Sequence, residues 1–112
     1  MANNIAFQGP GNTFVIATTT ANTAVTAPVS SNTPSNQYRI TSSTTAAFVR
    51  ISESNVAAVL PTSTTSQPGF WLTNAQTAVV TAPQCSSTKT VYVSVISDVA
   101  NATVLVVPGE GL

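Results

Sequence analysis

Few side chains in this chain of 112 residues could take part in catalysis. The chain has no histidine and a single cysteine, Cys85, so it cannot build a Ser–His or Cys–His nucleophile pair. The same shortage excludes zinc sites made with histidine or with four cysteines. We therefore predict no catalytic residue, no metal site and no cofactor site. The six residues with formal charge, whose charges cancel, are Arg39, Arg50, Lys89, Glu53, Asp98 and Glu110.

The carboxylates of Glu53 and Asp98 are the remaining candidates for acid–base chemistry, because glycosidases use such a pair across the scissile bond. Each acid lies beside a turn-like stretch rich in serine, and nothing in the sequence brings the two together. We interpret both as solvated loop carboxylates. The sequence Gly9-Pro10-Gly11 is predicted to be a turn and not a phosphate loop, because proline removes an amide donor and neither a helix nor a lysine follows.

The composition also argues against nucleic acid and membrane partners. Affinity for DNA comes largely from several Lys or Arg contacts to phosphate, and this chain has three basic residues in scattered positions. No apolar run approaches the roughly 20 residues that span a bilayer. The N-terminus has neither the basic nor the apolar region of a signal peptide, so we expect synthesis in a reducing cytoplasm, where one unpaired cysteine is ordinary.

The surface is expected to be neutral and rich in hydroxyl groups. Only 5% of the residues are charged, against about 25% in ordinary soluble domains. Serine and threonine together make up 32 residues. Freely diffusing proteins usually keep their net charge away from zero, because neutral surfaces associate. The composition therefore favours a structural protein that works inside an assembly, and it disfavours an enzyme.

The chain is predicted to be all-β. Residues with β-branched side chains dominate, no window has sustained helical spacing of apolar residues, and clusters of Ser, Thr, Asn and Pro separate short runs. The predicted strands are Thr13–Thr18, Thr23–Ala27, Gln37–Thr41, Ala46–Ser52, Phe70–Thr73, Thr77–Ala82, Thr90–Ser97 and Thr103–Val107, with a weaker candidate at Val56–Leu60.

Alternation within these runs indicates strands with one buried and one wet face, which is typical of antiparallel sheets. Tyr38 and Ile40 are expected to share one face of their strand, and Val91, Val93 and Val95 are expected to share one face of theirs. About eight such strands in one domain imply a single antiparallel β-sandwich over residues 1–112, with residues 1–12 as an extended N-terminal arm. Two short loops, Ser42–Thr45 and Asp98–Ala102, are predicted to close β-hairpins between the strands on either side of them.

The two halves of the chain resemble each other. The matched segments, at offsets of 54 to 56 residues, are Phe14–Ile16 with Phe70–Leu72, Asn22–Pro28 with Gln76–Pro83, Tyr38 with Tyr92, and Phe48–Ile51 with Val104–Val107. Two copies of a four-strand unit would explain the matches. Chance similarity between strands rich in Thr, Ala and Val would explain them equally well.

Three aromatic residues are candidates for contact with another protein, namely Phe7, Phe70 and Trp71. Adjacent residues of a strand point to opposite faces, so either Phe70 or Trp71 should lie outside the core of its own domain. An exposed large aromatic side chain is a typical anchor of a protein–protein contact. Phe7 precedes the first strand, where it can either anchor a contact or fold back over the sandwich.

The order of several short segments resembles small virion proteins of tailed bacteriophages. These segments are Phe7–Thr13 at the start, Tyr38–Ile40, Ala47–Ile51, and an alternating strand that runs into Pro108–Leu112. The most similar members are capsid decoration, or cement, proteins, which lie on the outer shell as trimers or dimers. The resemblance implies binding to the major capsid protein, association with further copies of this chain, and no catalytic residues.

The leading hypothesis is therefore a decoration protein that clamps neighbouring capsid subunits on the outer capsid surface. The scarcity of basic residues agrees with this position, since a protein that faces the packaged genome meets dense phosphate. The alternative is a binding module of the tail, neck or fibre that recognises a host glycan or another virion protein. In that case Trp71 and Tyr92 are the residues expected to contact the sugar.

Overall fold

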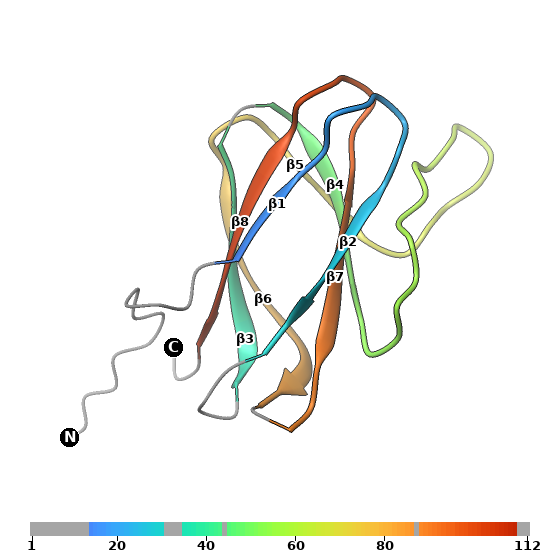
Figure 1. Cartoon of the computed structure of the whole chain (residues 1–112). Coiled ribbons are helices and arrows are strands. Elements are labelled where there is room, and N and C mark those ends of the chain that lie inside the picture. The colour runs from blue at the N-terminus through green and yellow to red at the C-terminus, as the bar shows by residue number, and fades with distance from the viewer. Residues whose placement is uncertain (1–13, 31–34, 44, 87, 110–112) are drawn as a thin grey trace.

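The computed structural model describes residues 14–30, 35–43, 45–86 and 88–109 (Figure 1). This part of the chain contains eight strands and no helix, and so no helix that could cross a membrane. The strands are β1 (Phe14–Ala17), β2 (Val25–Val29), β3 (Ser35–Ser42), β4 (Ala47–Ser52), β5 (Phe70–Leu72), β6 (Thr77–Cys85), β7 (Val91–Ile96) and β8 (Thr103–Gly109). Every one of the eight predicted strands is confirmed, with ends that shift by at most three residues.

The strands form two antiparallel sheets that enclose the core between them (Figure 1). Sheet A has the order β1-β8-β3-β6, and sheet B has the order β2-β7-β4-β5. The predicted β-sandwich is thus confirmed. Successive strands lie in opposite sheets at every step except from β4 to β5, and this alternation gives the arrangement known as a jelly roll.

Both predicted hairpins are wrong. Strand β3 lies in sheet A and β4 in sheet B, and likewise β8 lies in sheet A and β7 in sheet B. The loops between them therefore cross from one sheet to the other. The strands on either side of these loops hydrogen-bond to strands that are distant in the sequence, as β3 does with β6 and β8. A loop of four or five residues between two alternating strands is compatible with both arrangements, because either one buries the apolar faces in the same core.

Buried hydroxyl groups hold the loops that cross between the sheets. Thr18, which follows β1, is only 1% exposed. Its Oγ1 accepts a hydrogen bond from the N–H of Ala102 at 3.2 Å, and its own N–H donates to the Ala102 carbonyl at 2.8 Å. The Ser97 hydroxyl donates to the carbonyl of Ala46 at 2.8 Å and accepts from the N–H of Val99 at 3.2 Å. Some of the many hydroxyl side chains are therefore structural, because they satisfy backbone groups outside the sheets.

The core consists of the alternate residues that the sequence pattern predicts. Tyr38 and Ile40 of β3 are both fully buried, as are Val91, Val93 and Val95 of β7. The free thiol of Cys85 is buried in the same cluster.

The segment between β4 and β5 packs on the outer face of sheet B. Ala58 is 2% exposed and forms a small apolar cluster with Phe48 and Ile96. The N–H of Ala58 donates to the Oγ of Ser94 at 2.8 Å. The weak strand predicted at Val56–Leu60 is wrong, because this segment is held by apolar contacts and a side-chain acceptor in place of a strand ladder.

We expect Ser94→Ala to lower the free energy of unfolding by about 1 kcal/mol, because it leaves the buried N–H of Ala58 without its acceptor. The same substitution removes the acceptor of the Thr26 hydroxyl, which donates to Ser94 at 2.9 Å. Urea denaturation measures the effect. Thr62→Ala, on the exposed part of the same segment, is the control and should change the stability by less than about 0.5 kcal/mol. Equal losses for the two variants would contradict this explanation.

The two halves of the chain share one topology. When each of β1 to β4 is exchanged with its counterpart among β5 to β8, the strand order of sheet A becomes that of sheet B. The order of sheet B likewise becomes that of sheet A. Residues 14–16 and 70–72 also share one pattern of exposure, namely half-buried, exposed and buried. However, two of the matches are wrong. Tyr38 lies in the core whereas Tyr92 lies on the opposite side of its strand from the buried Val91 and Val93. Val104 likewise lies in the main core, whereas Phe48 lies in the small cluster on the outer face of sheet B.

Candidate functional site

The outer face of sheet A is a broad surface that the described loops leave uncovered (Figure 1). The strand register places one row of four side chains across it, namely Val15, Leu105, Thr41 and Thr77. The neighbouring row contains Val107, Arg39 and Val79. Two valines of this face have large exposed fractions, 61% for Val15 and 46% for Val79.

The chemistry of this face suits contact with another protein. Arg39 is the single charged side chain among the described residues of the two rows, and threonines and aliphatic side chains surround it. Serine and threonine lose less rotamer entropy on burial than lysine or glutamate. Such a face can bind a protein surface through apolar contacts and hydrogen bonds, with little dependence on charge.

The structure places Phe70 and Trp71 on opposite faces of β5, as predicted. Phe70 is half-buried and packs against the main core. Trp71 is 44% exposed on the outer face of sheet B, where its ring meets that of Phe48 edge-on with a centroid distance of 5.5 Å. The structure therefore does not bring the two predicted contact residues together. The third, Phe7, lies outside the described residues.

Tyr92 shares the outer face of sheet B with Trp71 but lies well away from it. Tyr92 pairs with Ser52, whereas Trp71 pairs with Phe48 in the row that contains Ile96. Four residues along a strand correspond to about 13 Å. The segment around Ala58 contacts Ser94, which lies between the two rows, so the two aromatic rings do not form a continuous stacking surface.

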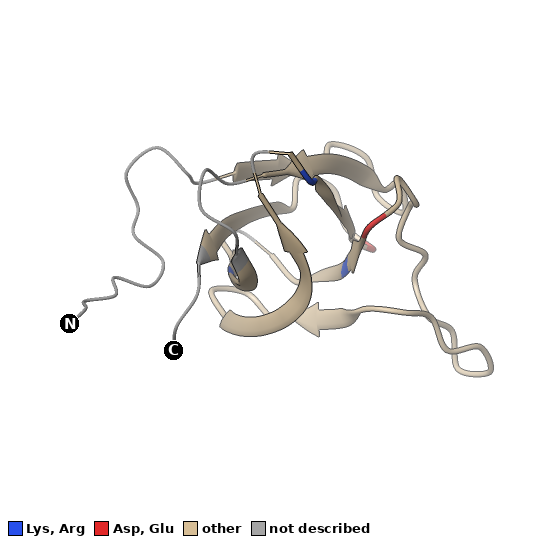
Figure 2. Ribbon diagram, turned by 90° about the horizontal axis from the view of Figure 1, so that it is seen from below, with Lys and Arg blue, Asp and Glu red and all other residues tan. Residues whose placement is uncertain are grey.

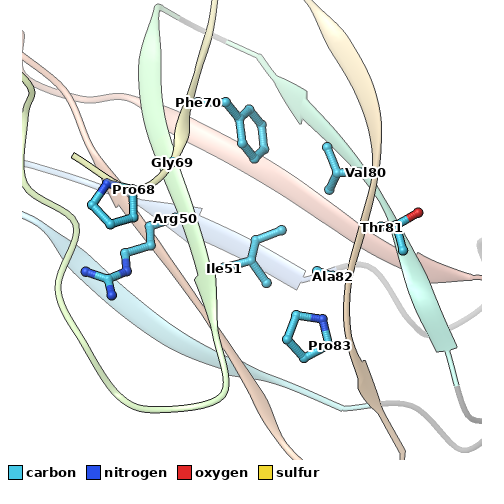
Figure 3. A pocket seen from close by; sticks show the side chains of 9 residues that line it. All are labelled: Arg50, Ile51, Pro68, Gly69, Phe70, Val80, Thr81, Ala82 and Pro83. Atoms are coloured by element: carbon cyan, nitrogen blue, oxygen red, sulfur yellow. The ribbon is translucent and has the colours of Figure 1, made fainter. Parts of the chain in front are cut away.

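A hollow of about 370 Å³ opens between the sheets where β5 and β6 form their edges (Figure 3). We call it the edge hollow, and its lining residues are Arg50, Ile51, Pro68, Gly69, Phe70, Val80, Thr81, Ala82 and Pro83. It exists because β5 has three residues and the opposing β6 has nine, so that β5 leaves part of β6 without a partner strand across the sandwich. The hollow is mainly apolar, since the Arg50 side chain extends to the other side of β4 from Ile51 (Figure 3).

Beside the edge hollow, Tyr38 fixes the backbone of β6. Its hydroxyl donates to the carbonyl oxygen of Pro83 at 2.5 Å. Pro83 lies where the pairing of β3 with β6 shifts register, between Thr81 and Cys85. Burial, and next the neighbouring Cys85 thiol, raise the pKa of the Tyr38 hydroxyl well above its ordinary value near 10.

The charged residues of the described part are few and scattered (Figure 2). The Oε2 atom of Glu53 lies 3.7 Å from the Nζ atom of Lys89 in an exposed ion pair. Glu53 and Asp98 follow opposite ends of the antiparallel pair β4 and β7, about 20 Å apart along the strands, so they do not form a catalytic pair. No cluster of three potential metal ligands occurs among the residues that the structure describes.

Sequence reasoning missed the edge hollow. The signal that could have revealed it is the difference in length between the predicted strands Phe70–Thr73 and Thr77–Ala82, together with Pro68-Gly69 ahead of the shorter one. A short edge strand opposite a long one leaves the core open at that edge. Comparisons with protein families, with curated proteins and with solved structures found no match to this chain.

Proposed function

We propose that this chain is a structural virion protein of a tailed phage, a decoration protein that binds the outer capsid surface and stabilises the shell. Its partners are the major capsid protein and further copies of itself, and it has no enzymatic activity and binds no nucleic acid. The observation that carries the proposal is the outer face of sheet A, with its exposed Val15 and Val79 and the single charge of Arg39.

Several physical properties support a place inside a protein lattice. A net charge of zero and a surface rich in hydroxyl groups favour association over free diffusion. Many copies of a modest interface reinforce one another when the partners form a regular shell. The jelly roll is compatible with this role, since capsid proteins use it, but lectins use it too, so the fold alone does not choose between the two functions.

The proposal predicts many copies of the chain on each purified particle and a loss of particle stability without it. Particles that lack the protein should release their genome at a lower temperature and after a milder osmotic shock, measured by dye access to the DNA. Added back to such particles, the protein should restore the stability of the parent particle. Equal resistance of the two kinds of particle would overturn the clamping role.

The contact face has its own prediction. Thr41→Arg places a long charged side chain in the middle of the outer face of sheet A and is expected to weaken binding to particles at least about tenfold. Val99→Arg, which alters a 44% exposed valine in the loop between β7 and β8, is the matched control and should bind like the parent. Raising the ionic strength from about 0.1 M to about 1 M should leave the affinity unchanged within about twofold, because few charges take part.

The second candidate function is a glycan-binding module of the tail, neck or fibre, which the exposed ring of Trp71 favours. A sugar-binding surface usually needs several aromatic rings on one face, and the segment around Ala58 lies between Trp71 and Tyr92. This function predicts few copies per particle and glycan binding that Trp71→Ala abolishes. Copy number on the intact particle therefore separates the two functions.

A further inference from the structure

Strand β6 presents a long free edge. It has nine residues and pairs only with β3 among the described strands. The N–H of Ser42 donates to the carbonyl of Gln76 at 3.0 Å, in register with the pairing of β3 and β6. In an antiparallel ladder, hydrogen-bonded pairs alternate with non-bonded pairs. The backbone groups of Thr77, Val79 and Thr81 therefore point away from β3, toward the open edge.

The edge hollow lies directly inside this edge. Val80 and Ala82 of β6 form one of its walls, and Ile51 and Phe70 form the wall opposite (Figure 3). Because side chains alternate along a strand, an extended segment added beside β6 would direct every second side chain into the hollow. A cavity of about 150 Å³ already admits a benzene ring, so a hollow of about 370 Å³ accepts one large aromatic side chain.

The chain carries a segment with the matching pattern ahead of β1. The described structure begins at Phe14, and residues 1–13 precede it. In an extended conformation Ile5 and Phe7 share one side, while Ala6 and Gln8 share the other. The turn sequence Gly9-Pro10-Gly11 separates this segment from β1. The geometry points to strand exchange, in which residues 3–8 of one copy add to the β6 edge of a neighbouring copy and Phe7 enters the edge hollow.

The donor is a second copy because the arm is too short to serve its own domain. Strands β1 and β6 are the two opposite edges of sheet A. A strand added beside β6 lies four strand spacings, about 19 Å, from β1. The six residue steps from Gln8 to Phe14 span about 20 Å when fully extended. Nothing of that length remains for the turn at Gly9-Pro10-Gly11 or for passing over the side chains of the outer face.

The test is the mass of the full-length protein in solution, measured by light scattering after size exclusion over a range of concentrations. The parent protein should be oligomeric. Phe7→Ala should weaken the association at least about tenfold, because it removes the side chain that fills the hollow. Val79→Pro should do the same, because it removes an outward N–H from the β6 edge without breaking a bond to β3.

Val15→Pro is the matched control. Its N–H points outward from β1, since the neighbouring bonded pair of this ladder is Thr18 with Ala102. It therefore makes the same change in an exposed valine at the opposite edge of sheet A, and it should keep the mass of the parent. Thermal unfolding shows whether each variant is folded. If Val79→Pro does not fold, the mass of Phe7→Ala alone tests the strand exchange. A monomeric parent, an unchanged mass for Phe7→Ala, or dissociation by Val15→Pro would each overturn the inference.

Discussion

Gly69→Ala is expected to lower the free energy of unfolding by about 3 kcal/mol. Gly69 has a φ of +135°, a conformation that residues with a Cβ rarely adopt. A Cβ at this position would lie 2.6 Å from the carbonyl oxygen of Val49 and 2.7 Å from the ring of Phe48. The first atom belongs to the paired backbone of β4, and the second belongs to a ring packed against Trp71.

Chemical denaturation measures this loss, and Ala75→Gly is a useful opposite case. Ala75 adopts a φ of 64° in the turn after β5, so glycine relieves strain there while it adds entropy to the unfolded chain. The two terms offset each other, and the net change should stay within about 1 kcal/mol. A loss for Gly69→Ala no larger than the change for Ala75→Gly would show that β4 and β5 can separate at little cost.

The positions of the strands could be predicted because one-sided burial leaves a signal in each strand by itself. The alternate valines of β7 and the pair Tyr38 and Ile40 of β3 are all buried in the core. This pattern is local, so it can be recognised in the sequence without knowing which strands are neighbours in the sheet. The same holds for Phe70 and Trp71, whose adjacency alone places them on opposite faces.

The pairing of the strands could not be predicted, because alternation is the same for a hairpin and for a crossing between sheets. The loops 43–46 and 97–102 have lengths that suit hairpins, yet they cross the sandwich and are held by buried hydroxyl groups such as that of Ser97. A serine that satisfies a backbone carbonyl in such a loop looks the same in the sequence as a serine in an exposed turn.

The candidate contact surfaces were predictable only in part. An exposed Trp71 follows from the sequence, but the outer face of sheet A gathers Val15, Thr41 and Val79 from three strands that are far apart in the chain. The same is true of the edge hollow, whose walls come from β4, β6 and the start of β5. Sites assembled by strand order become visible only once the order is known.

Tyr38→Phe is expected to lower the free energy of unfolding by about 2 kcal/mol at neutral pH. The Tyr38 side chain is fully buried, and its hydroxyl donates to the carbonyl of Pro83 at the register shift of β6. Phenylalanine fills nearly the same space but removes the donor of this half-buried carbonyl and the hydroxyl that interacts with the buried Cys85 thiol, and the loss of a hydrogen-bond partner inside a protein costs about 1 to 3 kcal/mol. Tyr92→Phe, which removes the other tyrosine hydroxyl of the chain from sheet B, is the matched control and should change the stability by less than about 0.5 kcal/mol.

The difference between the parent and Tyr38→Phe should also depend on pH. The folded state raises the pKa of the Tyr38 hydroxyl above its unfolded value near 10, so the folded protein holds this proton more tightly than the unfolded chain does. The stabilisation is complete below about pH 10 and declines by up to about 1.4 kcal/mol for each pH unit above it. The stability advantage of the parent over Tyr38→Phe should therefore shrink by about 1.4 kcal/mol at about pH 11, as measured by urea denaturation at each pH. An advantage that stays constant from neutral pH to pH 11 would mean that the buried hydroxyl ionises as freely in the folded protein as in the unfolded chain, and the bond to Pro83 would then have to be reconsidered.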